Sequence, residues 1–269
     1  MRSFVLLLLQ LSLCLSAAVA CGPKYDVYLL IGQSNMAGRG VFEAADTLAP
    51  IEGVYLLDGD GNPVPAQEPL NRYSTIRKAL PLQGMGPGHA FAEEIHARTG
   101  RRVLLVVNAR GGSSLEQWMP EAQPAFFSHS PNEQEGMAGR QMPGFYDETV
   151  RRTRQALRYG PLRAILWHQG ESNSDSLRVG NYLPMLSRFA SSLREDLGVG
   201  EAVPFIAGEI QPLHPNAGFF NPVIRRIGEA IPNAFCVSSE GLPTNPDQLH
   251  FTRDAQLELG RRYAAMALQ

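Results

Sequence analysis

Several features are scarce in this 269-residue chain, and each scarcity excludes a class of protein. There are only three cysteines and no Cys-x-x-Cys or His-x-x-x-His spacing, which argues against a metal site. Basic residues number 24 and acidic residues 26, so the net charge of −2 argues against a nucleic-acid-binding protein, which usually carries a basic excess. A hydrophobic fraction of 44% excludes a disordered chain and allows a sizeable core.

The one apolar run that could be taken for a membrane span lies at the amino terminus. Arg2 gives a short positive start, residues 4–15 are almost entirely apolar, and Ala18-Val19-Ala20 has the small-x-small pattern that signal peptidase cleaves. The run is shorter than the roughly 20 residues that a transmembrane helix needs. We therefore expect residues 1–20 to be a signal peptide, residues 21–269 to form a single domain without a transmembrane segment, and the protein to be secreted or periplasmic.

Cys14 lies in the expected signal peptide, so export would leave Cys21 and Cys236 in an oxidising compartment. Cys21 would be the first residue after cleavage, and two alternatives stay open for it. It is either the lipidated residue of a lipoprotein anchored at the cell envelope or the disulfide partner of Cys236. Ala18 disfavours the lipoprotein, because Leu is usual at the start of the lipidation signal. A single bridge would not amount to a disulfide framework.

Short apolar runs alternate with stretches of helical periodicity along the chain. The runs read as buried strands because they show no polar alternation, as in a parallel sheet covered on both faces. About five such alternations predict a three-layer α/β/α fold with a mainly parallel central sheet of about five strands, of the flavodoxin-like kind. The expected strands cover residues 25–31, 54–57, 103–107, 164–167, 204–210 and 234–237, and the expected helices cover residues 89–98, 147–159, 181–197, 223–230 and 253–268.

In folds of this class the reactive groups follow the carboxyl ends of the strands. Ser34 comes two residues after the first strand, where its hydroxyl would be exposed at the edge of the sheet. Asp247 and His250 come after the last strand, and a turn would let the carboxylate orient the imidazole so that it activates a serine. Alternatively, Ser34 and Asp247 only cap helices and His250 is a surface residue.

Two further strand ends carry groups that could stabilise negative charge. Gly111 and Gly112 follow residues 103–107, and adjacent glycines can present a backbone amide to a ligand. Gln169 and Glu171 follow residues 164–167, and a glutamine amide can donate to an oxyanion. The alternatives are an ordinary turn and a solvated loop charge. Taken together, these strand ends predict a nucleophile, a base with its orienting acid, and an oxyanion donor set.

The motifs that contain these residues resemble those of the SGNH (GDSL-like) hydrolase superfamily. They are most similar to the carbohydrate acetylesterase branch, which includes sialate O-acetylesterases and acetylxylan esterases. The serine motif is G-x-S-x-M and so differs from the G-x-S-x-G elbow of α/β-hydrolases. The resemblance covers nearly the whole chain after the signal peptide and rests on GQSNMAGRG (32–40), QGMGPGHAFAEE (83–94), GGSSLEQW (111–118), WHQGESN (167–173) and DQLHFT (247–252).

The resemblance implies a role for each matched residue. Ser34 would be the nucleophile, His250 the general base and Asp247 its partner, acting through an acetyl-enzyme and without a metal or other cofactor. The oxyanion hole would consist of the amides of Ser34 and Gly112, or Gly111 in place of Gly112, together with the Gln169 side chain.

Three other residues lie in or directly beside the matched motifs. Glu171 would orient His250 or position Gln169. Arg110 and Trp118 would line the sugar pocket, although Trp118 fits a packing role equally well.

The expected partner is thus an acetylated carbohydrate. A lipase or thioesterase of the same superfamily would use the same residues on other acyl esters, and a non-catalytic carbohydrate-binding protein could retain the fold. The polar loops favour a sugar ester over a long acyl chain. A Rossmann-type nucleotide-binding protein is disfavoured, because G-x-G-x-x-G does not follow the first strand.

Overall fold

The structure of the chain is a computed structural model that describes residues 24–73, 82–122 and 144–269. The expected signal peptide and Cys21 lie outside these residues, so both expectations stay predictions. Cys236 forms no disulfide with any residue in the described ranges, and burial raises the pKa of its thiol to about 12.

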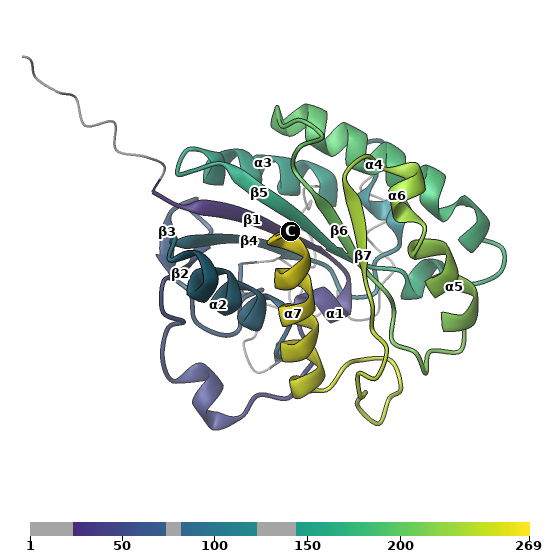
Figure 1. Cartoon of the computed structure of the whole chain (residues 1–269), viewed down its shortest axis with the longest axis horizontal. Coiled ribbons are helices and arrows are strands. Elements are labelled where there is room, and N and C mark those ends of the chain that lie inside the picture. Colours follow the sequence, from purple (N-terminus) through teal and green to yellow (C-terminus); the bar gives the residue numbers. More distant parts are fainter. Residues whose placement is uncertain (1–23, 74–81, 123–143) are drawn as a thin grey trace, which may run out of the picture.

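The centre of the fold is one seven-stranded sheet with the order β3-β2-β4-β1-β5-β6-β7 (Figure 1). All neighbouring strands pair in parallel except β3, which runs antiparallel to β2. The predicted three-layer fold is therefore confirmed, with a larger sheet than the five strands expected. The strands are β1 (Asp26–Gly32), β2 (Val54–Leu57), β3 (Pro63–Pro65), β4 (Val103–Ala109), β5 (Leu162–His168), β6 (Phe205–Gly208) and β7 (Ala234–Val237).

The additional strand β3 is a short edge strand that the periodicity does not reveal. It has only three residues, and two of them are prolines, which are confined to sheet edges because they cannot donate a backbone hydrogen bond. The turn that leads into it is built by Asp58, whose carboxylate accepts from the amides of Asp60 and Asn62. The Asp-Gly-Asp-Gly-Asn-Pro sequence of residues 58–63 is typical of such a turn, whereas nothing local indicates the pairing after it.

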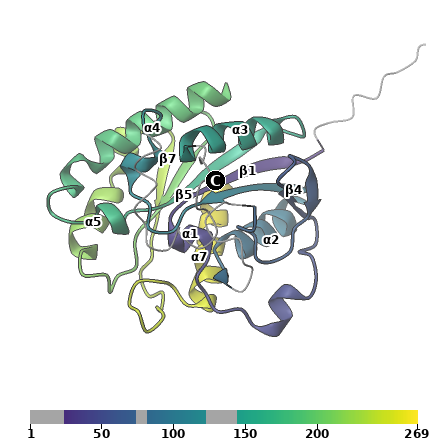
Figure 2. The same cartoon turned by 180° about the vertical axis from the view of Figure 1, so that it is seen from behind.

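Helices cover both faces of the sheet (Figures 1 and 2). On β1, Val27, Leu29 and Ile31 face one hydrophobic core together with α3 and α4, while Tyr28 and Leu30 face a second core with α2 and α7. Burial on both faces explains why the strands read as unbroken apolar runs. The helices are α1 (Ser34–Ala37), α2 (Gly88–Thr99), α3 (Phe145–Leu157), α4 (Tyr182–Leu197), α5 (Ala217–Ile224), α6 (Ile227–Ala230) and α7 (Arg253–Ala267).

The helix expected over residues 223–230 is two helices, α5 and α6, and the first begins six residues earlier than predicted. Pro222 lies inside α5, where it removes one backbone hydrogen bond. Phe220 and Ile224 lie four residues apart and are both fully buried in the core. Burial of these two side chains outweighs the lost hydrogen bond, so tertiary packing overrides the local signal.

Three central strands end at the same level of the sheet. Gly32 at the end of β1 pairs with Ala109 of β4 on one side and with His168 of β5 on the other. Gly32 has φ of 137°, and a Cβ at this position would lie 2.1 Å from the His168 carbonyl oxygen. Only glycine fits there. The loops that follow these three strands therefore leave the sheet side by side, in the region where α1 lies (Figure 1).

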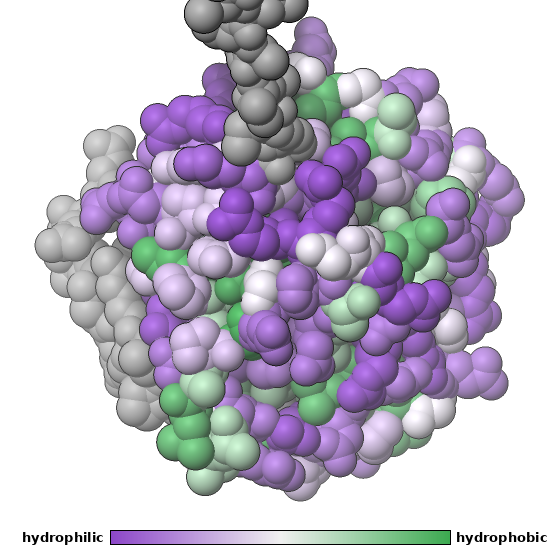
Figure 3. All heavy atoms as spheres, turned by 60° about the vertical axis from the view of Figure 1, so that its left-hand side comes forward, coloured by the Kyte–Doolittle hydropathy of each residue, from purple (hydrophilic) through white to green (hydrophobic). Residues whose placement is uncertain are grey.

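The surface is of mixed polarity. Figure 3 shows small, separate groups of hydrophobic side chains among hydrophilic ones on the face that it displays. Within the described ranges, no helix is both long enough and apolar enough to cross a membrane.

Candidate active site

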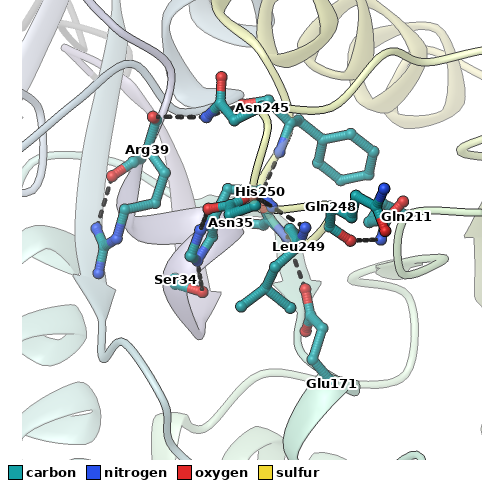
Figure 4. A network of polar contacts seen from close by, with 12 residues as sticks. Ser34, Asn35, Arg39, Glu171, Gln211, Asn245, Gln248, Leu249 and His250 are labelled. Carbon is teal, nitrogen blue, oxygen red and sulfur yellow. Dashed lines mark hydrogen bonds and ion pairs between the residues drawn. The ribbon is translucent and has the colours of Figure 1, made fainter. Parts of the chain in front are cut away.

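Ser34, His250 and Asp247 form one hydrogen-bonded chain. The Nε2 atom of His250 lies 2.9 Å from the Ser34 Oγ, and its Nδ1 atom lies 2.6 Å from Oδ2 of Asp247. Ser34 begins α1 directly after β1, while Asp247 and His250 lie in the loop between β7 and α7. Figure 4 shows the His250 ring directed at Ser34. The hydrogen bond that the Asp-x-x-His spacing predicts is therefore present, and the other ring nitrogen of His250 lies within hydrogen-bond reach of the serine.

The Asp247 carboxylate also organises the loop that carries it. Its Oδ1 accepts from the amides of Leu249 at 3.0 Å and His250 at 2.9 Å. Partial burial acts to raise the pKa of Asp247, but these amides and the imidazole outweigh it and lower the pKa overall. Thr252, and not Asp247, is the N-cap of α7, because the Thr252 side chain accepts from the Ala255 amide. The alternative role of Asp247 as a helix cap therefore does not apply.

Backbone amides border the serine on the side of β4. Gly111 lies beside Ser34, since a Cβ at position 111 would be 3.8 Å from the Ser34 Cβ and 2.5 Å from Nη2 of Arg39. Gly112 adopts φ of 73°, and nothing lies within 4 Å of the position that its Cβ would take. In the described part of the chain, no backbone acceptor is recorded for the amides of Ser34 and Gly112. Both amides are therefore suited to an incoming oxyanion.

The three loops at this edge are tied to one another. Oε1 of Gln33 accepts from the amides of Gly170 at 3.3 Å and Ser172 at 3.4 Å, which links the β1 loop to the β5 loop. The Ser172 hydroxyl donates to the carbonyl of Gly112 at 3.2 Å, which links the β5 loop to the β4 loop. The position of the amides beside Ser34 thus depends on all three strands.

Gln169 does not occupy the position expected of an oxyanion donor. Its side chain is fully buried, and its Nε2 donates both to the Ser113 carbonyl at 3.2 Å and to Oδ1 of Asn173 at 2.8 Å. Its Oε1 accepts from the Tyr182 hydroxyl at 2.7 Å. Because both amide hydrogens are directed to protein acceptors, the side chain braces the loop from beneath and has no donor left for a substrate.

Arg110 and Trp118 do not line a sugar pocket, because both side chains are completely buried. The Arg110 guanidinium pairs with the Glu148 carboxylate of α3 at 2.6 Å and lies over the ring of Phe145. The Trp118 indole donates to the Ser113 hydroxyl at 2.8 Å, and its ring packs in the core. Both side chains are buried where α3 packs against the end of β4. Their position after a strand end does not by itself reveal this burial.

Within the described residues, the Glu171 carboxylate is hydrogen-bonded to Asn35, and not to His250 or Gln169 as expected. Its Oε1 accepts from Nδ2 of Asn35 at 2.6 Å. Burial raises the pKa of Glu171 to about 7, against the lowering effect of its own backbone amide and of Asn35.

His168 at the end of β5 is likewise buried. Burial lowers its pKa to about 3 and keeps the imidazole neutral.

Sequence reasoning missed several polar residues around His250. Asn35 follows the serine directly and is completely buried, Gln211 lies just past β6, and Asn245 precedes Asp247. Gln211 was detectable, because it is a polar residue after a strand end, the same signal that identified Ser34. Asn35 was inside a matched motif, but its partners are distant in the sequence.

Within the described ranges, no group of three or more His, Cys, Asp or Glu side chains could hold a metal ion.

Comparisons with known proteins place this geometry in a family. A family model described as carbohydrate esterase, sialic acid-specific acetylesterase (SASA), matches residues 24–269. The probable carbohydrate esterase At4g34215 of Arabidopsis thaliana is 31% identical over 257 residues, and the match covers 88% of each chain. The crystal structure of that protein has a TM-score of 0.74 at 28% identity and covers 91% of this chain and 98% of its own.

Two more distant structures share the fold. NanS has a TM-score of 0.64 at 17% identity, covering 92% of this chain and 98% of its own. XAC1771, a carbohydrate acetylesterase from Xanthomonas citri, has a TM-score of 0.60 at 18% identity, covering 90% of this chain and 55% of its own. Because the family model spans the sheet, the serine motif and the Asp-x-x-His loop alike, the chain belongs to the SASA family of carbohydrate esterases and is a carbohydrate O-acetylesterase.

Proposed function

We propose that this protein removes O-acetyl groups from carbohydrates with a Ser34–His250–Asp247 triad. The observation that carries the proposal is the continuous hydrogen-bonded chain of 2.9 Å and 2.6 Å from the serine hydroxyl through the imidazole to the carboxylate. A nucleophile, a base and an orienting acid within hydrogen-bond reach are what acyl transfer through a serine requires.

In the first half of the reaction, Ser34 Oγ attacks the acetyl carbonyl carbon while Nε2 of His250 accepts the hydroxyl proton. The tetrahedral intermediate then collapses, the bond to the sugar oxygen breaks, and the imidazolium returns its proton to that oxygen. In the second half, His250 activates water, which attacks the acetyl-enzyme. Acetate leaves, and the serine recovers its proton. Asp247 keeps the correct tautomer and stabilises the imidazolium.

The backbone amides of Ser34 and Gly112 are the proposed oxyanion donors. Gly111, the residue before Gly112, lies beside Ser34, and the described residues offer the Ser34 and Gly112 amides no backbone acceptor. Donors that are fixed in advance stabilise the developing negative charge without reorganising during the reaction. With Gln169 committed to its own partners, these two amides replace the three-donor set expected from the sequence.

The proposed substrates are O-acetylated sugars, with O-acetylated sialic acid placed first because the family description names it. Acetylated xylan is the second class. The amino-terminal segment supports a secreted or periplasmic enzyme, with a lipid anchor at Cys21 and a Cys21–Cys236 disulfide as alternative fates of that cysteine.

Acetate release from acetylated sialoglycans, xylan and pectin tests the proposal, with the Ser34→Ala protein as the control. We expect release from at least one of these substrates and its loss in the variant, whose circular dichroism spectrum should match that of the original protein. Covalent labelling by an organophosphonate should likewise require Ser34. Faster hydrolysis of long-chain than of acetyl nitrophenyl esters would instead indicate a lipase, and absence of both hydrolysis and labelling would indicate a non-catalytic binding protein.

A further inference from the structure

The loop that carries His250 has little apolar packing of its own. It is closed at its base by a β-bridge between Thr244 and Phe251, and Leu249 is the one leucine, isoleucine, valine or aromatic residue at positions 245–250. Asp247 and Gln248 are exposed, and Gln248 adopts the left-handed conformation with φ of 54°. Because a residue without glycine's freedom is strained there, hydrogen bonds to the rest of the molecule must hold the loop.

Asn35 supplies hydrogen bonds on both sides of the base. Its Nδ2 donates to the carbonyl of Leu249 at 3.2 Å, and its Oδ1 accepts from the amide of Phe251 at 3.2 Å. These two residues flank His250 in the chain. Since Asn35 is also the residue directly after Ser34, a single side chain connects the backbone of the nucleophile to the backbone on either side of the base (Figure 4).

Glu171 determines which way the Asn35 amide faces. Its Oε1 accepts from Nδ2 at 2.6 Å, while Gln256 of α7 donates to Oδ1 at 3.4 Å. Turning the amide over would set the Asn35 oxygen against the Glu171 carboxyl group and the Leu249 carbonyl, and its NH₂ group against the Phe251 amide. The Glu171 contact therefore opposes a flip that would break both bonds to the His250 loop.

The burial of Glu171 is costly for the fold. Among the described residues, its Oε2 is buried without a hydrogen-bond partner, and the carboxyl group pairs with no cationic side chain. Burial of an acid without a cation raises its pKa, here to about 7. Burying this carboxyl group without a cation lowers the stability of the fold. Its presence therefore points to a role other than stabilising the fold.

We propose that Glu171 and Asn35 are positioning residues that hold the His250 imidazole within hydrogen-bond reach of Ser34. Glu171 orients the Asn35 amide, and Asn35 fixes the backbone of residues 249 and 251. Neither side chain needs to touch the substrate. The inference rests on the proposed function, because it assumes that His250 is the base.

The test measures kcat and KM for a nitrophenyl acetate substrate in Asn35→Ala and Glu171→Ala. Displacing a base by a fraction of an ångström to one ångström costs up to about 100-fold in rate, so we expect kcat to fall about 10- to 100-fold with KM little changed. Glu171→Gln keeps an acceptor for Nδ2 and should restore most of kcat. In the Asn35→Ala background, Glu171→Ala should cause no further loss, because the two residues act in series.

A matched control separates positioning from mere stabilisation. Asn233 directly precedes β7, at the amino-terminal end of that strand, and its Nδ2 donates to two backbone carbonyls, those of Glu201 and Ala202. Asn233→Ala should lower the melting temperature without changing kcat per folded molecule. If Asn35→Ala and Glu171→Ala behave like this control, the positioning role is wrong.

The same measurements distinguish a failure of the proposed function from a failure of the positioning role. Full activity in His250→Ala would remove the base itself, and the positioning role with it. A dead His250→Ala together with unchanged kcat in the Asn35 and Glu171 variants would overturn the positioning role alone. Equal kcat losses in Glu171→Gln and Glu171→Ala, or additive losses in the double variant, would also contradict it.

Discussion

The imidazole of His250 lies 2.9 Å from the hydroxyl oxygen of Ser34, although 216 positions separate the two residues in the chain. One residue follows the first strand of the sheet and the other follows the last. They meet because β1 lies in the middle of the sheet, and the long loop after β7 returns across the strand ends before α7 begins (Figures 1 and 4). The site therefore depends on the complete sheet and not on any local segment.

The first prediction concerns His250 and Asp247, the proposed base and its partner. His250→Ala should lower kcat on a small acetyl ester on the order of 10⁴-fold or more, and Asp247→Asn should lower it on the order of 10²- to 10⁴-fold by disturbing the tautomer. Steady-state kinetics and the melting temperature should be measured together. His96→Ala is the control, since His96 lies near the end of α2 and its imidazole bonds to the Arg101 carbonyl at 2.8 Å. Equal activity of the His250 and His96 variants would rule out the triad.

The second prediction concerns the Gly112 amide, the proposed oxyanion donor. Its φ of 73° means that Gly112→Ala costs about 1–2 kcal/mol in stability, because a Cβ is disfavoured in this conformation. Relief of that strain should rotate the amide and lower kcat by about 10-fold or more. Gly198→Ala is the matched control, with φ of 65° at the end of α4 and nothing within 4 Å of its Cβ position. Both variants should lose stability, and only the first should lose kcat.

The third prediction concerns the buried pair of Arg110 and Glu148. Glu148→Ala leaves the guanidinium buried without its partner and should destabilise the protein by about 3–5 kcal/mol in chemical denaturation. The KM of the folded fraction for an acetylated sugar should not change, because the Arg110 side chain is inaccessible. Replacing both residues together by Met and Leu should recover much of the stability. A raised KM without loss of stability would instead indicate that Arg110 contributes to the sugar pocket.

The fourth prediction concerns pH and Glu171. Burial raises its pKa to about 7 from the ordinary 4.5, so the folded protein holds this proton more tightly than the unfolded chain does. The resulting stability is fully present below pH 4.5 and is lost as the pH rises through 7, by about 3 kcal/mol. Glu171→Gln is permanently neutral at this position. Its melting temperature relative to the original protein should therefore increase between pH 5 and pH 8.

Glu229→Gln serves as the control for this pH series. The exposed Glu229 has its pKa lowered by a hydrogen bond from Arg226, so it stays ionised throughout this range. Its difference in melting temperature should be constant from pH 5 to pH 8. A constant difference for Glu171→Gln as well would show that Glu171 does not titrate near neutrality.

The amino-acid sequence by itself determined where the chain turns from strand to loop and which chemical groups stand at those turns. Apolar runs doubly buried in a parallel sheet are visible as unbroken stretches, and the polar residues after them stand out for the same reason. Ser34, Asp247 and His250 were found in this way, and so was the alternation of layers. The short edge strand β3 and the early start of α5 were not, because both depend on partners that the local pattern does not contain.

Only the tertiary structure decided which way each of those polar side chains turns. Gln169, Arg110 and Trp118 have the right chemistry at the right edge, yet each is drawn inward by a partner from another element: Tyr182, Glu148 and the core around Phe145. Asn35 bonds to groups more than 130 residues away, and no sequence spacing indicates such contacts. Strand ends follow from local hydrophobicity, whereas the orientation of a polar side chain follows from which distant donors and acceptors packing brings within about 3 Å.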